Sequence, residues 1–207
     1  AALTTTQVVS LTAAQLDGLD ATHLAALSSV ASLTSTQLNA MASTNLQGLN
    51  TTQVASLTTT QVSNLTTTQL NLLETSDVAA LSTGAVASLT STQLNALTST
   101  NLQALTTGQN AALTTTQASN LTSTQLNLMQ TSDVAALSSA AAASLTSTQL
   151  NALTSTNLDA LTTAQVSKLT TTQVSNLTST QLNLMETTDL AALTTTQVVS
   201  LTAAQLD

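Results

Sequence analysis

Few residues in this chain could take part in chemistry. Its 207 residues include one histidine, His23, one basic residue, Lys168, nine acidic residues and no cysteine. A nucleophile or a general acid–base site needs dissimilar side chains brought together with tuned pKa values. A thiolate metal site needs cysteine. The sequence therefore predicts that the chain is not an enzyme, and it gives no candidate catalytic, cofactor-binding or metal-binding residue.

One series of acidic residues is regularly spaced. Asp77, Asp133 and Asp189 recur every 56 residues, and a glutamate precedes two of them by three residues. Such a series could supply a ladder of calcium ligands, but Gln130 interrupts it and no glycine-rich acidic loop accompanies it. We expect these aspartates to lie near helix N-termini, where negative charge is favoured by the helix dipole.

The acidic residues belong to an eight-residue repeat, Leu-Thr-x-x-Gln-(Leu/Val)-x-x, that runs along the chain. Each repeat is called an octad here, and its positions are numbered one to eight from the leucine. His23 occupies position five, where most octads have glutamine, so we expect it to be a capping or surface residue. Fixed-period repetition of this kind is typical of solenoids and arrays.

Longer repeats are built from the octads. The sixth octad of each long block differs from the rest: it opens at Leu73, Met129 or Met185, carries the aspartate, and is a candidate for contacts between chains. We expect residues 1–207 to form one continuous array, cut as a window from something longer. The blocks are 33–88, 89–144 and 145–200, with seven octads each; a short insert, 11–32, ends in a six-residue unit, and residues 1–17 recur unchanged as 191–207, giving an overall period of 190.

The octad has the pattern of a short capped helix. In residues 57–64, Thr58 is a candidate N-cap and Gln61 the reciprocal partner of a capping box. Leu57 and Val62 then stand at the two positions of a hydrophobic staple. We expect a helix of about one and a half turns, closed at position eight by residues that tolerate the left-handed conformation, such as Gly18.

Two other folds compete with a helical solenoid. A β-solenoid would use the high threonine content, but strand alternation places positions one and six on opposite faces. In one long helix, an eight-residue repeat would not match the 3.6-residue turn, so the leucines would be spread around the helix and would not form one apolar face. The sequence therefore predicts an all-α repeat solenoid of very short capped helices, one per octad, without a conventional globular core; the alternative is a β-solenoid.

Composition excludes several partners. The net charge is −8 with a single basic residue, whereas nucleic-acid binding depends on many cations. The sequence has no run of about 18 apolar residues, which is the length needed to span a membrane, so we expect no membrane insertion. Freedom from cysteine suits a protein that works outside the cell without disulfides. Serine and threonine hydroxyls could carry O-linked glycans, and the N-glycosylation sequence occurs at Asn50, Asn64, Asn120 and Asn176.

The run Leu57 to Val62 resembles the opening of the first helix in transcription-activator-like effector repeats, but those repeats are several times longer. That family implies DNA binding. Because this chain is acidic, we do not expect it to bind DNA. Over its whole length the chain is more similar to the Leu/Thr/Gln-rich octapeptide tandem-repeat regions of very large bacterial secreted and cell-surface proteins. That resemblance implies a filament, stalk or adhesin-like spacer, located outside the cell or at its surface.

The favoured function is therefore structural. We expect a segment of a long repetitive extracellular fibre or surface-protein stalk, which associates with identical chains or neighbouring repeats. The alternative is a repetitive adhesion or surface-binding module that contacts ice, mineral or polysaccharide through rows of threonine and serine.

Overall fold

Each repeat unit forms one short helix. A computed structural model describes residues 3–27 and 30–206, and within these residues every regular element is helical. The α-helices are four to six residues long, as expected from the octad. The all-α prediction is confirmed, and the β-solenoid is not supported.

The helices fall into two compact units, Ala1–Leu105 and Thr106–Asp207. The first unit contains α1 (Thr5–Ser10), α2 (Ala13–Asp17), α3 (Ala21–Ala25), the 3-10 helix η1 (Val30–Ser32), α4 (Ser35–Ala40), α5 (Ser43–Gln47), α6 (Thr51–Ala55), α7 (Thr59–Asn64), α8 (Thr67–Leu72), α9 (Thr75–Ala80), α10 (Thr83–Ser88), α11 (Ser91–Ala96) and α12 (Ser99–Gln103). The second contains α13 (Thr107–Ala111), α14 (Thr115–Asn120), α15 (Ser123–Leu128), α16 (Thr131–Ala136), α17 (Ser139–Ser144), α18 (Ser147–Asn151), α19 (Ser155–Asp159), α20 (Thr163–Val166), α21 (Thr171–Ser175), α22 (Ser179–Leu184), α23 (Thr187–Ala191), α24 (Thr195–Val199) and α25 (Ala203–Leu206).

The threonine at position two begins most helices. In α11, Thr90 has extended backbone angles, and its hydroxyl accepts the N–H of Gln93 at 3.1 Å. The Gln93 Oε1 accepts the N–H of Thr90 at 2.8 Å, which completes a capping box. Such boxes satisfy two of the free N–H groups at a helix start. The predicted cap is therefore confirmed.

Positions one and six form the core of each compact unit. In the octad of α7, Leu57 and Val62 are both buried, and the same holds for Leu89 and Leu94 in the octad of α11. Burying one such side chain stabilises the fold by about 1.5–3 kcal/mol. Because a helix this short is unstable alone, these side chains must be covered by neighbouring coils.

The predicted left-handed helix closure is wrong. Among the described residues no backbone φ is positive, and Gly18 has φ −77° and ψ −8°. The helix closes because the leucine that opens the next octad is extended, as Leu65 is with φ −60° and ψ 138°. Its N–H donates to the carbonyl of Val62 at 3.2 Å. The turn therefore needs no special residue at position eight.

This closure makes a testable prediction for Gly18. A Cβ at Gly18 would lie 3.5 Å from the carbonyl oxygens of Ala14 and Gln15, an ordinary contact. We expect Gly18→Ala to raise the free energy of unfolding by about 0.4–1 kcal/mol, because alanine restricts the unfolded chain. Urea denaturation followed by circular dichroism measures this change. A loss of stability would instead indicate a strained, left-handed position.

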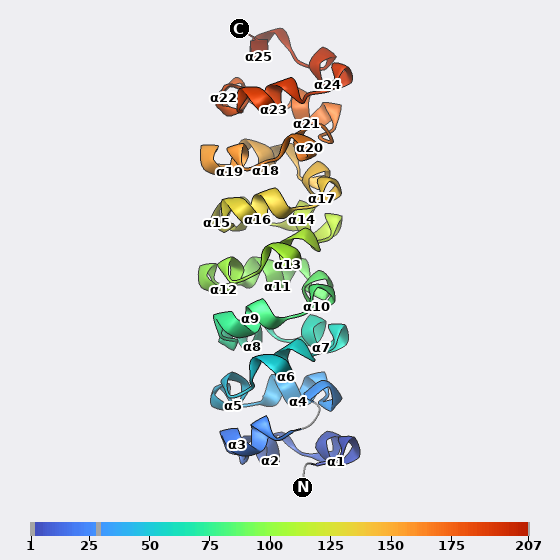
Figure 1. Ribbon diagram of the computed structural model, residues 1–207, viewed down its shortest axis with the longest axis vertical. Coiled ribbons are helices and arrows are strands. Elements are labelled where there is room, and N and C mark those ends of the chain that lie inside the picture. Colours follow the sequence, from blue (N-terminus) through green and yellow to red (C-terminus); the bar gives the residue numbers. More distant parts are fainter. Residues whose placement is uncertain (1–2, 28–29, 207) are drawn as a thin grey trace. The chain divides into compact units, whose positions relative to one another are not determined.

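Three units complete one turn of the coil. Within a unit, helices pack on the third helix before them, as α7 does on α4 and α10 on α7 in the first unit (Figure 1). In the second unit α17 packs on α14, and α20 on α17. A coil of three octads therefore contains 24 residues. In the insert, η1 packs against α1 and α6, so the six-residue unit holds the place of a whole octad. Residues 28–29 of that unit lie outside the described residues.

The differing octads do not line up. The blocks contain seven octads, which is not a multiple of three. Within the second unit, Asp133 belongs to α16, which stacks with α13 and α19, whereas Asp189 belongs to α23, which stacks on α20. These two aspartates therefore lie in different columns of helices and cannot form one ladder.

Candidate functional site

The position-five glutamines join one coil to the next. Besides capping its own helix, Gln93 donates from Nε2 to the carbonyls of Val62 at 2.9 Å and Leu65 at 2.8 Å, and its side chain is buried. Val62 and Leu65 lie where the helix of one octad ends and the next octad opens. One glutamine therefore holds both its own helix start and a helix end in the preceding coil.

This contact recurs at fixed separations of 31 and 28 residues. In the first unit Gln61 reaches the carbonyls of Val30 and Leu33. In the second unit the same pair of hydrogen bonds is made by Gln149, Gln165, Gln181, Gln197 and Gln205. The sequence interpretation gave these residues only the local capping role and missed the contact between coils.

Asparagines at position seven form a second set of contacts between coils. Asn71 donates from Nδ2 to the Ala96 carbonyl at 2.7 Å, and its Oδ1 accepts the N–H of Thr98 at 3.0 Å. Asn39, Asn127 and Asn151 each make the same pair of bonds. Where such an asparagine takes the cap N–H, the glutamine no longer needs to.

The aspartates of the differing octads remove the contact that glutamine makes. Asp77 is only 2% exposed and lies in the first turn of α9, where the side chain of Glu74 makes no cap hydrogen bond. Desolvation by burial raises the pKa of Asp77, and a hydrogen bond with the backbone of Glu74 partly offsets this rise. An ionised carboxylate can accept that N–H but has no donor for the coil before it. The expected place near a helix N-terminus is confirmed.

In the middle block the aspartate has a buried polar neighbour. Burial raises the pKa of Asp133, and a hydrogen bond with the side chain of Asn110 opposes the rise. Asn110 stands at position six, where nearly all octads have an apolar residue, and it is 1% exposed. A polar residue at this normally apolar position is the sequence feature from which the contact between Asn110 and Asp133 could have been predicted. The pKa of Asp189 is also raised, by burial and then by the negative charges of Glu186 and Asp159.

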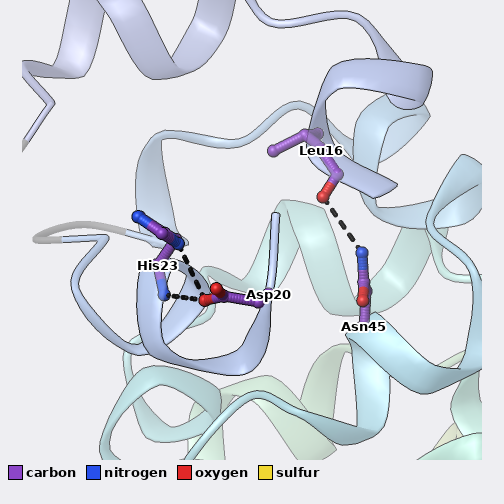
Figure 2. A network of polar contacts seen from close by, with 4 residues as sticks. All are labelled: Leu16, Asp20, His23 and Asn45. Carbon is purple, nitrogen blue, oxygen red and sulfur yellow. Dashed lines mark hydrogen bonds and ion pairs between the residues drawn. The ribbon is translucent and has the colours of Figure 1, made fainter. Parts of the chain in front are cut away.

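His23 lies in the first turn of α3 (Ala21–Ala25), whose N-cap is Asp20. Figure 2 shows the backbone N–H of His23 donating to Asp20 Oδ1 at 2.9 Å, with the ring Nδ1 2.8 Å from the same oxygen. Both side chains are well exposed, and these hydrogen bonds lower the pKa of Asp20. In the same view Asn45 Nδ2 donates to the Leu16 carbonyl at 3.0 Å, the coil-to-coil contact made by an asparagine. Of the two roles expected for His23, capping or surface residue, the structure shows the surface position, and Asp20 supplies the cap.

Neither metal-binding nor membrane-spanning elements are found in residues 3–27 and 30–206. No group of three or more His, Cys, Asp or Glu side chains is close enough there to hold a metal ion. In the same residues no helix has the length and apolar character needed to cross a bilayer. What the arrangement does offer, within each compact unit, is a hydrogen-bonding pattern that recurs from coil to coil wherever position five holds glutamine.

Comparison with known proteins agrees with this repetitive organisation. The profile of the ALTTAQ repeat family matches residues 30–67, 70–107 and 127–163, more than half of the chain. The six letters of that name occur in order at residues 160–165. A search of curated proteins finds no match to the chain.

Proposed function

Because the chain belongs to the ALTTAQ repeat family and folds into stacked coils, we propose that it is a structural protein. It forms a segment of a long repetitive extracellular fibre or surface-protein stalk. Its repeats carry mechanical load and act as a spacer of defined length, and they catalyse no reaction.

The observation that carries this proposal is the glutamine contact between coils. Gln93 and Gln197, in different compact units, bond to carbonyls at the same two separations along the chain. Wherever position five holds glutamine, a coil therefore presents the same donor to the coil before it, and the carbonyls that accept it stand at the same two separations. A repeat of this kind can be extended without a change of interface, since stability in such arrays grows with the number of stacked units.

The composition supports a place outside the cell. The stacked coils are stabilised by leucine packing and by hydrogen bonds of neutral amides, and only 5% of the residues are charged. Such contacts are little affected by salt, because screening acts on charges. Serine and threonine hydroxyls on the outside could carry glycans.

Electron microscopy of purified protein tests the structural role. A chain of two tandem 190-residue periods should give particles twice as long as a chain of one period, with a helical circular dichroism spectrum. The fibre proposal fails if the protein is disordered, or if particle length does not grow with the number of periods. Antibody labelling of intact source cells tests the location, which is contradicted if label enters only after the cells are opened.

A repetitive surface-binding module is the second candidate. It is favoured by the exposure of the threonines at positions three and four, such as Thr59, Thr60, Thr171 and Thr172. Rows of hydroxyls could contact ice, mineral or polysaccharide. A series of Thr→Val substitutions at these positions should abolish such binding while the helical spectrum is kept; unchanged binding would exclude this candidate.

A further inference from the structure

Two consecutive octads in the first unit lack the glutamine that joins one coil to the next. Position five is Asp77 in the octad of α9 and Ala85 in the octad of α10. The two octads before this pair and the octad after it all have glutamine there. An ionised carboxylate and a methyl group have no N–H to donate. The pair of octads, residues 73–88, is called the joint here, because the glutamine contacts are interrupted for two of the three octads that make one coil.

The carbonyls that such contacts would use have no side-chain donor. By the separations of 31 and 28 residues, they are those of Leu46 and Leu49 for residue 77. For residue 85 they are those of Val54 and Leu57. In the part of the chain that the structure describes, no side chain donates to any of the four, whereas the equivalent carbonyls before and after them accept from glutamine. The joint therefore has fewer hydrogen bonds to the coil before it than its neighbours have.

Apolar packing and one shared hydroxyl hold the joint to the coil before it. Helix α9 packs on α6, and α10 packs on α7, where Ala85 and Val86 are fully buried. Ser88 Oγ lies 3.0 Å from the carbonyl oxygen of Thr59 and 2.7 Å from the carbonyl oxygen of Ala85 in its own helix. Because a hydroxyl has one hydrogen, it cannot serve both carbonyls fully. The joint is therefore held mainly by side-chain packing, without the paired amide bonds found elsewhere.

The second unit has the same interruption but adds a contact across it. Asp133 and Ala141 stand at position five in the octads of α16 and α17, and the side chain of Asn110 is hydrogen-bonded with Asp133. In the first unit the place equivalent to Asn110 is held by Val54, which cannot form such a bond. The joint is therefore the less tightly held of the two interruptions.

We propose that the array opens first at the joint when the chain is under tension, by separation of α9 and α10 from α6 and α7. In a repeat array each unit contacts only its neighbours, so one interface can open while the others stay closed. Local opening is easiest where the fewest contacts must break. A segment of this kind lengthens by one step under load and closes again when the load is removed. This proposal rests on the proposed structural function and says where the spacer yields.

A donor-restored variant of the full chain tests the proposal. Asp77→Gln with Ala85→Gln supplies both missing donors, and the third block already has glutamine at the place equivalent to residue 85. The control, Thr60→Gln with Asp159→Gln, adds as many glutamines and changes the net charge equally, at exposed positions outside the joint. Circular dichroism checks that each chain is helical. Asp77→Gln alone takes the place of the donor-restored variant if the double substitution prevents folding.

Amide hydrogen exchange at neutral pH measures opening without load. The amides of Val78 and Val86, in the joint, and of Val62 and Leu94, beside it, all donate to carbonyls four residues earlier. In the wild type we expect the two amides of the joint to exchange about tenfold faster or more than the two beside it. The donor-restored variant should remove this difference, and the control should keep it. Equal exchange at all four amides of the wild type would overturn the proposal, as would a difference that persists in the donor-restored variant.

Pulling the full chain by its two ends with optical tweezers tests the joint under load. The wild type and the control should show one reversible lengthening, at a lower force than the main unfolding, that the donor-restored variant lacks. The same events in the donor-restored variant and the wild type would overturn the proposal. That result would leave the fibre function standing, because a spacer without a joint is still a spacer. A disordered wild-type chain would contradict the proposed function itself.

Discussion

Replacing Gln93 with methionine should lower the free energy of unfolding by about 2–4 kcal/mol. Methionine is close to glutamine in length and in helix propensity, so the main loss is of hydrogen bonds. The carbonyl of Leu65 loses its glutamine donor in the core, and a buried polar group without a partner costs about 1–3 kcal/mol. The N–H of Thr90, at an exposed helix start, loses the cap, which costs about 1 kcal/mol. Urea unfolding followed by circular dichroism measures the total.

Gln15 supplies a matched control inside the same chain. It makes the same capping box with Thr12, at 2.8 Å and 3.2 Å, but it is exposed and in the described residues it bonds to no other coil. Gln15→Met should therefore cost only the cap, about 1 kcal/mol. The difference between the two variants isolates the contact between coils. Equal losses in both would show that glutamine acts only as a cap.

Amide hydrogen exchange locates the same effect along the chain. In repeat arrays stability is shared between neighbours, and local opening can precede global unfolding. We expect Gln93→Met to speed exchange of the Leu65 and Leu94 amides, on both sides of the lost contact, and to leave the amides near Gln181 protected. Uniformly faster exchange would mean that the loss is not local.

The helices could be predicted from the sequence because their determinants lie within eight residues. A cap at Thr58, its partner Gln61 and a staple from Leu57 to Val62 are all local. The predicted left-handed closure at Gly18 is wrong because the residue that closes the helix belongs to the next octad. The extended leucine that follows position eight turns the chain, so the left-handed residue that longer helices often use is not needed.

The number of units per turn depends on contacts 28 and 31 residues apart, and these do not follow from the octad alone. One sequence signal did point to them. A capping box accepts glutamate as readily as glutamine, yet position five never holds glutamate in this chain. At most position-five sites the side chain also donates, as Gln61 does to Leu33, and an ionised glutamate could not. Asn157 meets the same need by donating to the Leu126 carbonyl at 2.8 Å.

The six-residue unit keeps the number of units per period a multiple of three. Because η1 takes the place of a full octad against α1 and α6, the 190-residue period contains 24 units. This number is a multiple of three, although the seven octads of a block are not. A chain that keeps three units per turn would therefore bring every unit back to its own column after one period.

Replacing Asp77 and Asp189 with asparagine should stabilise the protein at neutral pH by about 1–3 kcal/mol for the pair. Asparagine has the shape of aspartate, and its Nδ2 can donate to the preceding coil as Asn157 does. By the same register the acceptors are the carbonyls of Leu46 and Leu49 for residue 77. Each restored hydrogen bond contributes about 0.5–1.5 kcal/mol.

The wild-type protein should become more stable as the pH falls from 7 toward 4. Burial raises the pKa of Asp77, Asp133 and Asp189 in the folded state above the usual value for aspartate. A group with a raised folded pKa contributes its stability below the unfolded pKa and loses it as the pH rises through the folded pKa. The pKa of Asp20 is lowered, so the stability that it contributes is lost only in more acidic solution. Melting temperatures from pH 7 to below pH 4 measure both trends.

The asparagine variant should show a flatter pH profile than the wild type, and the two should converge as the pH falls, because the carboxyl of Asp77 can itself donate once it is protonated. Glu74→Gln with Glu186→Gln is the matched control. It removes two negative charges from exposed neighbours of the same aspartates, and Gln130 already occupies the equivalent place in the middle block. An equal gain from this control would assign the effect to net charge. A larger gain from asparagine, lost toward pH 4, would assign it to the donor that aspartate lacks.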